Sequence, residues 1–384
     1  MSPLVWLLGR LSDAGKPGRV LAPEADLIRS LGWRATRDLH RAERSAGAWM
    51  PTLRRLLYQE IWEEAAQTLG ATLHPLTGDF LLMEKEGART VVSYQTVMLD
   101  NEISLLLAKD KAAAHALLGQ LGIPTATHIE LDAADRATGR TFVEGRRVPC
   151  VVKPAANTSG GEGVTCGVAN AADLERARLW ARRWDRRLLL EEQALGSEYR
   201  LLFLDGELLD IVLRRPPCVI GDGMASVAEL IAAENARRES ARGRAGTSSL
   251  QVDLDCLLAL QRKGLDLASV PARGRLVEVK AATNQSSGAQ NRTVRPGEVG
   301  PALIAEAATA IRAVGLRFGG VDVITPDPRR SLRDAGGIVV EVNGTPGFQY
   351  HYLVADPANA TRVAVPVLAA LLDRERTPSF PASG

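Results

Sequence analysis

The sequence predicts a mixed α/β (α+β) protein, because stretches with helical spacing of apolar residues alternate with short apolar runs bounded by turn residues. Within residues 1–105, the helix-like stretch TLRRLLYQEIWEEAAQTLGA precedes the strand-like stretch DFLLMEKEGARTVVSYQ. Farther along, YRLLFLDGELLDIVLRR predicts a hairpin around Asp205-Gly206, a residue pair that suits a turn with positive φ. The length of 384 residues is enough for two or three domains of about 100 to 200 residues each.

The remaining elements follow in order along the chain. The stretch KDKAAAHALLGQLG predicts a helix that ends at Gly122, just before Pro124. VPCVVKPAA predicts a buried strand, and TSGGEG a glycine-rich turn after it. The later predictions are a helix over 171–183, a strand in RRLLLEEQ, mainly helix over 225–265, a strand leading into a polar loop over 272–295, a helix over 300–315, and strands over 318–325 and 337–343.

The composition narrows the class of protein. Apolar residues make up 46% of the chain and charged residues 24%, which argues against disorder and against a membrane span. No signal peptide is evident at the N-terminus, so we expect a cytoplasmic protein. A net charge of +2 does not indicate a nucleic-acid partner, and a homodimer is the default expectation for a soluble enzyme. Four scattered cysteines indicate core residues rather than a zinc site or disulfides: Cys150, Cys166, Cys218 and Cys256.

Three patterns could carry chemistry, and the first is VVKPAANTSGGEG. No P-loop, nucleophile elbow, zinc helix or dinucleotide fingerprint occurs in the chain. Lys153 ends a buried strand and is followed by a Ser/Gly loop, so a fixed cation would lie beside close backbone N–H groups. An oligophosphate requires both. The alternative is a surface lysine followed by an ordinary turn.

The second pattern is LLLEEQALGSEYR. After an apolar strand, the backbone of residues 191–194 offers donors and acceptors beside apolar side chains, which suits a flat heterocycle. Glu198 could then bind a vicinal diol. The alternative is that these glutamates are surface residues at the end of a strand.

The third pattern is the strand pair GGVDVITP and GIVVEVNG. Alternation along a strand places Glu341 and Asn343 on the same face, and Asp322 can lie opposite them. Three oxygen ligands without His or Cys favour Mg²⁺ over zinc. The alternatives are that the strand frays into the polar turn NGTPG, or that the acids pair with Arg317 or Arg292.

Read together and in order, these motifs resemble the ATP-grasp superfamily. The resemblance runs from about Asp110 to Gly347 and is nearest to the ATP-grasp region of cyanophycin synthetase and related peptide ligases, and more distant to D-alanine-D-alanine ligases. It rests on DKAAAHALLGQLGIP, VVKP with SGGEGV, EEQALGSEYRLLFLDGELL, RRPPCVIGDGMASVAELI, NQSSGAQNRTV, GGVDVITP and IVVEVNGTPG. It implies an ATP-grasp fold with a small N-terminal α/β substrate domain (1–105), a first lobe (106–195) and a second lobe (196–384) that grip ATP.

The resemblance also implies roles for individual residues. Lys111 and Lys153 would hold ATP phosphates under a mobile lid over residues 158–163, which includes Ser159, Gly160 and Gly161. Adenine would lie against Glu191, Glu192, Gln193 and Ala194, chiefly through their backbone, and Glu198 would bind ribose. Two Mg²⁺ ions would be held by Asp322, Glu341 and Asn343. A transferring phosphate or a substrate carboxylate would meet Arg200, Arg214 or Arg215, and Arg292, and an oxyanion would meet the backbone of Gly347.

The implied activity is ATP-dependent ligation of a carboxylate to an amine of amino-acid or peptide substrates, through an acyl phosphate, with release of ADP and phosphate. Cyanophycin synthetases carry a further C-terminal ligase domain, whereas this sequence stops soon after the metal motif. We therefore expect a dipeptide or modified peptide rather than polymer elongation. The alternatives are a hydroxyl or thiol acceptor, a kinase-like reaction that stops at phosphoryl transfer, or a catalytically silent nucleotide-binding partner protein.

Overall fold

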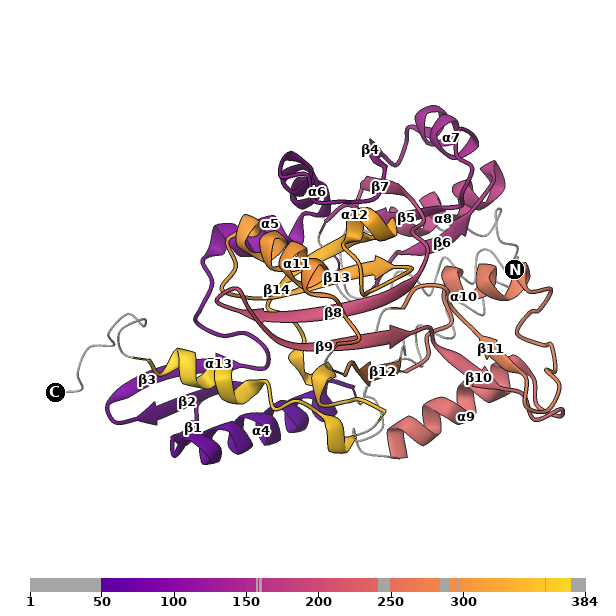
Figure 1. Cartoon of the computed structure of the whole chain (residues 1–384). Helices are drawn as coiled ribbons and strands as arrows, with labels where there is room; N and C mark the ends of the chain where they lie inside the picture. Colours follow the sequence, from indigo (N-terminus) through magenta and orange to yellow (C-terminus); the bar gives the residue numbers. More distant parts are fainter. Residues whose placement is uncertain are drawn as a thin grey trace, which may run out of the picture.

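The computed structural model describes residues 50–373, except 157, 159–160, 241–248, 284–289, 296 and 356. Helices and antiparallel sheets alternate through this part of the chain, which confirms the predicted fold class (Figure 1). Within it, no helix combines the length and the apolar character needed to cross a membrane.

Among the described residues, the largest sheet has five strands in the order β12-β9-β8-β13-β14. Its β8–β9 hairpin turns at Asp205 and Gly206, whose φ angles of 51° and 84° are positive as the sequence predicts. One face is apolar, where Leu201 and Val321 pack with Ile311 of the covering helix α11. The strand bounds are Gln290–Thr293 (β12), Glu207–Arg215 (β9), Ser197–Leu204 (β8), Phe318–Thr325 (β13) and Ile338–Gly344 (β14).

Helices α11 and α5 lie against the apolar face of this five-stranded sheet (Figure 1). α11 (Pro301–Val314) begins with a proline in its first turn and ends at Gly315, whose φ is 78°, so both ends follow the usual helix signals. α5 (Glu102–Lys109) was not predicted. It crosses the predicted domain boundary at 105/106, and the domain limits therefore stay a prediction.

A second sheet has four strands in the order β4-β7-β5-β6. Leu190 of β7 and Val152 of β5 pack with Leu174 of α8 in its core. The bounds are His128–Asp132 (β4), Arg187–Glu192 (β7), Cys150–Pro154 (β5) and Thr165–Val168 (β6), and the sheet is covered by α7 (Arg136–Glu144) and α8 (Ala171–Ala181).

Helix α6 (Lys111–Gln120) lies where the two sheets meet, and Asp110 caps its N-terminus. The backbone N–H of Lys111 donates to the carbonyl of Ala155, which follows β5, at 3.1 Å. The helix also contacts β14 of the five-stranded sheet. Close by, the backbone N–H of Val339 donates to the carbonyl of Pro124 at 2.8 Å. α6 therefore touches both sheets.

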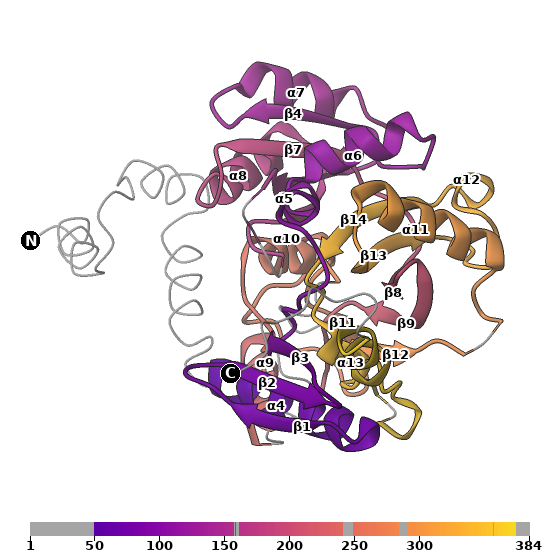
Figure 2. The same cartoon turned by 90° about the vertical axis from the view of Figure 1, so that its left-hand side faces the viewer.

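The N-terminal and C-terminal parts of the described chain share one core (Figure 2). Tyr58 and Trp62 of α4 meet Phe348 edge to face, with the Tyr58 and Phe348 ring centroids 5.2 Å apart. The hydroxyl of Tyr58 donates to Oε1 of Gln349. This unit contains α4 (Met50–Leu69), β1 (Thr72–Pro75), β2 (Phe80–Lys85), β3 (Ala88–Ser93), η2 (Phe348–His351) and α13 (Ala364–Leu371).

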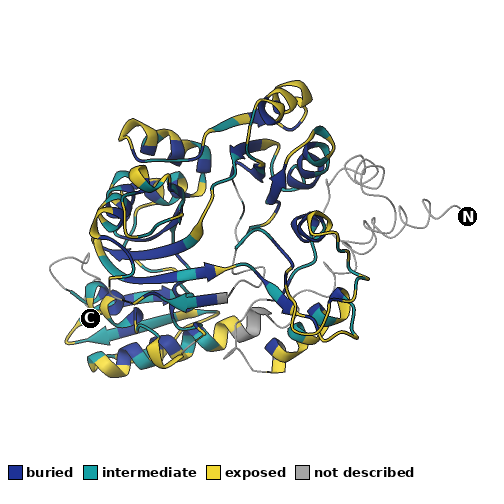
Figure 3. Cartoon of the chain, turned by 45° about the vertical axis from the view of Figure 1, so that its right-hand side comes forward, coloured by how far each residue is buried: buried dark blue, intermediate teal, exposed yellow. Residues whose placement is uncertain are grey.

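A smaller unit lies beside the four-stranded sheet and forms hydrogen bonds with the backbone of strand β6. Asp255 of α10 accepts a hydrogen bond from the backbone N–H of Cys166 at 2.9 Å, and Nη1 of Arg262 donates to the Cys166 carbonyl at 3.0 Å. Figure 3 colours the residues of the chain by burial, with buried residues in dark blue and exposed residues in yellow. Its elements are β10 (Cys218–Ile220), α9 (Val227–Ser240), α10 (Leu254–Arg262) and β11 (Leu276–Glu278).

Of the remaining element predictions, some agree with the structure, and several observed elements were not predicted. The prediction of mainly helix over 225–265 corresponds to α9 and α10, with residues 241–248 between them outside the described part. Strand β4 and helix α7 were not identified, and α12 (Leu332–Ala335) and η3 (Pro357–Asn359) are short additions. Residues 1–49 of the predicted N-terminal domain also lie outside the described residues.

Candidate active site

The second face of the five-stranded sheet carries a row of charged side chains. Asp322 of β13 lies directly opposite Arg200 of β8 and Glu341 of β14 in the strand register. Asn343 lies two residues after Glu341 and opposite Gly320, so it shares this face, as the sequence predicts. We call this surface the charged face. It is the reverse of the apolar face that α11 covers.

Asp322 is the centre of the charged face. Nη2 of Arg200 lies 2.6 Å from its Oδ2, Nη1 of Arg214 lies 3.1 Å from the same oxygen, and Nδ2 of Asn343 donates to it at 3.3 Å. Burial opposes ionisation, but Arg200 and Arg214 outweigh it and hold the pKa of Asp322 below its ordinary value. Asp322 is therefore a carboxylate at neutral pH.

Glu198 lies beside this centre and shares Arg214 with it. Nη1 of Arg214 is 2.6 Å from Oε1 of Glu198, and the hydroxyl of Thr283 donates to Oε2. Burial raises the pKa of Glu198 and the charge of Asp322 raises it further, although Arg214 opposes both effects. Glu198 is thus an acid whose charge depends on Arg214.

Lys111 and Lys153, which the resemblance assigns to ATP phosphates, each form an ion pair with a glutamate. Nζ of Lys111 lies 3.3 Å from Oε1 of Glu341, and Nζ of Lys153 lies 2.7 Å from Oε1 of Glu191. Lys153 and Glu191 are each about 95% buried. The lysines and the acids therefore converge on one region between the two sheets.

His115 belongs to this region, and sequence reasoning missed it. It is 2% exposed, its Nε2 lies 2.9 Å from the carbonyl of Val340, and its Nδ1 lies 3.5 Å from Oε1 of Glu191. Burial, and then the charge of Lys153, lower the pKa of His115. Its spacing of four residues from Lys111 places both on one face of α6, and that spacing was the available signal.

The structure does not bring Arg215 or Arg292 to the charged face. Strand register pairs Arg292 with Leu213, and alternation directs the side chains of Arg292 and Leu213 to the apolar side of the sheet. Arg292 pairs with Glu298 at 2.8 Å, and this contact lowers the pKa of Glu298 to about 2. Arg215 is exposed next to Arg214. Arg214, the alternative to Arg215, is the residue that reaches Asp322.

The alternative interpretation paired the acids of the third pattern with Arg317 or Arg292, and these partners are wrong. Arg317 binds Asp205 at 2.7 Å, whereas Asp322 binds Arg200 and Arg214. The fraying alternative is also wrong, because β14 continues to Gly344 in register with β13.

The predicted lid and adenine segments are described in part. Ser159 and Gly160 lie outside the described residues, whereas Gly161 has a φ of 77°. The side chain of Glu192 pairs with Arg146 at 3.1 Å, and Oε1 of Gln193 accepts from the backbone N–H of Gly167 at 2.7 Å. Ala194 follows β7 and is partly exposed, and Gly347 precedes η2. The nucleotide and oxyanion roles of these residues stay predictions.

The donor set fits a hard cation. Glu341 offers carboxylate oxygens, and Asn343 uses its amide N–H on Asp322, which leaves its Oδ1 as a further donor. Both oxygens of Asp322 accept hydrogen bonds from arginines, so Asp322 would have to exchange an arginine for the cation. Oxygen donors of this kind suit Mg²⁺. Among the described residues, no group of three or more His, Cys, Asp or Glu side chains is arranged to hold a metal ion, so the proposed donor set depends on the amide oxygen of Asn343.

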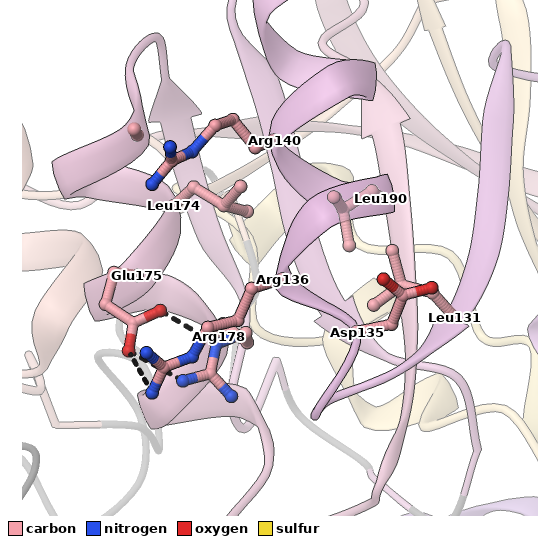
Figure 4. A pocket seen from close by; sticks show the side chains of 10 residues that line it. Leu131, Asp135, Arg136, Arg140, Leu174, Glu175, Arg178 and Leu190 are labelled. Atoms are coloured by element: carbon pink, nitrogen blue, oxygen red, sulfur yellow. Dashed lines mark hydrogen bonds and ion pairs between the residues drawn. The ribbon is translucent and has the colours of Figure 1, made fainter.

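A cavity of about 170 Å³ lies on the other side of the four-stranded sheet (Figure 4). Leu131, Leu174 and Leu190 line its apolar part, and Arg136 and Arg140 its charged part. Leu190 and Glu191 are neighbours in β7, so they point to opposite faces. The cavity is therefore separated from Lys153 and Glu191 by the sheet itself.

Comparisons with known proteins relate the chain to ligases. The cyanophycin synthetase of Trichormus variabilis is 30% identical over 293 residues, which cover 75% of this chain and 32% of that protein. The glutathione biosynthesis bifunctional protein GshAB of Mannheimia succiniciproducens is 31% identical over 261 residues, which cover 66% of this chain and 34% of that protein. The chain thus spans about a third of the length of these curated relatives. No family model matches it.

Among solved structures, a bifunctional glutathione synthetase from Pasteurella multocida is similar to this chain with a TM-score of 0.53 and 26% sequence identity. The alignment covers 82% of this chain and 44% of that one.

Proposed function

Because the chain belongs to the ATP-grasp superfamily, we propose that it is an ATP-dependent ligase that joins a carboxylate to an amine of amino-acid or peptide substrates. The observation that carries the proposal is the convergence of Lys111 and Lys153 with the oxygen donors Asp322 and Glu341 between the two sheets. A bound nucleotide requires such cations, and its metal requires such oxygens.

We assign the nucleotide site as follows. Lys111 and Lys153 exchange their present carboxylate partners for phosphate oxygens, and the backbone of residues 191–194 lies along adenine. Glu198 reaches ribose from β8. Asp322, Glu341 and Asn343 would hold Mg²⁺, which neutralises phosphate charge when bound.

The chain's own residues then position the reactants. Arg200 and Arg214 are buried cations beside the phosphate region, and their guanidinium groups suit the planar oxygens of a carboxylate or a transferring phosphoryl group. The substrate carboxylate attacks the γ-phosphate of ATP, and ADP leaves. An amine then displaces phosphate from the acyl phosphate and forms the amide. No protein nucleophile is needed, so positioning and electrostatics supply the catalysis.

The test is ADP and phosphate release with ATP and Mg²⁺, using amino acids and short peptides singly and in pairs, with mass spectrometry of the products. Ligation predicts release that requires a pair and a product equal to the two substrates minus water. A product that carries an ester or thioester would identify a different acceptor class. Nucleotide binding without release for any substrate would overturn the ligase proposal.

A matched pair of variants makes this test specific to the site. Arg200→Met removes a cation from the charged face, whereas Arg292→Met removes one from the apolar side of the same sheet. We expect release to be lost in the first variant and kept in the second. The opposite result would move the reaction to the other face.

A further inference from the structure

His115 makes contacts with both sheets at the junction. Its Nε2 lies 2.9 Å from the carbonyl of Val340 in the five-stranded sheet. Its Nδ1 faces Glu191 of the four-stranded sheet at 3.5 Å, and Glu191 in turn lies 2.7 Å from Lys153. His115 therefore lies between Val340, which precedes the proposed metal ligand Glu341, and Glu191, which pairs with the proposed phosphate ligand Lys153.

The contact with Val340 occurs at an irregularity in the sheet. Asp322 pairs with Glu341, and the next residue of β13, Val323, pairs with Val339, so Val340 is an extra residue in β14. Such a bulge leaves the extra residue outside the ladder and redirects the side chains beside it. The N–H of His115 supplies a partner for the Val340 carbonyl. His115 is therefore one of the contacts that hold the bulge beside Glu341, together with the hydrogen bond from the N–H of Val339 to the Pro124 carbonyl.

The hydrogen bond also defines the protonation of the ring. A carbonyl oxygen accepts, so Nε2 of His115 carries the proton. Lys153, Glu191 and His128 face the ring from the four-stranded sheet, with the His115 and His128 ring centroids 5.1 Å apart. Burial and the charge of Lys153 favour the neutral ring, which has one proton to donate. That proton is donated to the Val340 carbonyl, so Nδ1 carries a lone pair and forms no hydrogen bond with the Glu191 carboxylate, whose charge acts on the ring through space.

We propose that His115 is a positioning residue that couples the nucleotide side of the site to its metal side, so that Mg²⁺ strengthens nucleotide binding partly through this side chain. The proposal rests on the proposed function. Nucleotide bound at Lys153 changes the charges around Glu191 and the ring of His115. The ring is hydrogen-bonded to the bulge from which Glu341 extends. His115 touches neither the substrates nor the reacting atoms.

Calorimetry with the full chain and a non-hydrolysable ATP analogue tests the coupling. Affinity is measured in EDTA and in Mg²⁺, and the ratio of the two dissociation constants is the Mg²⁺ enhancement. Three variants separate the contacts of the ring. His115→Leu fills the space without a donor, His115→Gln places an amide N–H near the position of Nε2, and His115→Asn has a shorter side chain that does not reach Val340. Circular dichroism shows which variants fold.

We expect His115→Leu to reduce the enhancement by about threefold to tenfold, the usual worth of one buried hydrogen bond. His115→Gln restores it and His115→Asn does not. An unchanged enhancement in the Leu variant, an equal loss of affinity in EDTA and in Mg²⁺, or restoration by Asn as well as by Gln would each overturn the proposal. Should the unaltered protein fail to bind the analogue at all, the proposed function itself is refuted.

Discussion

Replacing Arg214 by leucine should destabilise the protein through one specific carboxylate. Arg214 is 5% exposed and its Nη1 contacts both Glu198 and Asp322. Without it, Asp322 keeps Arg200, whereas Glu198 keeps the hydroxyl of Thr283 and only the through-space charge of Arg200. Removal of one partner from a buried ion pair typically costs about 3–5 kcal/mol.

Protonation of Glu198 limits this cost. Starting from its ordinary pKa of 4.5, holding the carboxyl protonated at pH 7 costs about 3.5 kcal/mol, because each pKa unit is worth about 1.4 kcal/mol. At pH 5.5 the same protonation costs about 1.4 kcal/mol. We therefore expect Arg214→Leu to lower the free energy of unfolding by at most about 3.5 kcal/mol at pH 7 and by less at pH 5.5. The pKa of Glu198 is already raised in the unaltered protein, so part of the gain at pH 5.5 is common to both proteins.

Urea unfolding followed by circular dichroism at both pH values measures this difference. Arg215→Leu is the matched control, since Arg215 is the next residue, is exposed and points away from the charged face. Its effect should stay within about 0.5 kcal/mol at either pH. Equal losses in the two variants at pH 7, or a loss for Arg214→Leu that does not shrink at pH 5.5, would refute the reasoning.

Three further predictions concern the candidate site. Glu341→Gln should abolish ADP release while the protein stays folded, because one metal donor loses its charge; near-normal release would remove Glu341 from the metal set. Lys153→Ala should raise the KM for ATP by at least about tenfold, as expected for a lost buried phosphate contact, and an unchanged KM would place the phosphates elsewhere. Asp322 has a lowered pKa, so its stabilising contribution is present above about pH 4 and is lost as the pH falls through its folded value. The acid-induced decrease in unfolding free energy should therefore be smaller in Asp322→Asn than in the unaltered protein.

Local sequence signals predicted those elements whose residues decide their own conformation. Asp205-Gly206 predicted the hairpin because the turn demands positive φ, and Gly122 followed by Pro124 predicted the end of α6 to within two residues. α5 was missed because its eight residues become helical while packing on β14 and α11, a tertiary effect. The shared core of α4 and α13 was missed for the same reason, since no local sequence pattern in either helix indicates that it packs against the other.

For the site, alternation along a strand predicted that Glu341 and Asn343 share a face, and the register confirms it. The choice between Arg214 and Arg215 required the pairing of β9 with β8, because a shift of one residue exchanges the two faces of a strand. His115 could not be identified from its position alone. A buried histidine acquires its role from Val340 and Glu191, which lie on other elements and far along the chain.

The contact between Tyr58 and Gln349 spans 291 residues of sequence. At a synthesis rate of about 5–20 residues per second, the aromatic side of α4 would wait about 15–60 s on the ribosome before Phe348 emerges to cover it. During that interval Tyr58 and Trp62 present uncovered apolar surface, the kind of surface that chaperones bind. Slow translation anywhere between the codons of Tyr58 and Phe348 should therefore lower the yield of native protein more than equally slow translation of the codons before Tyr58.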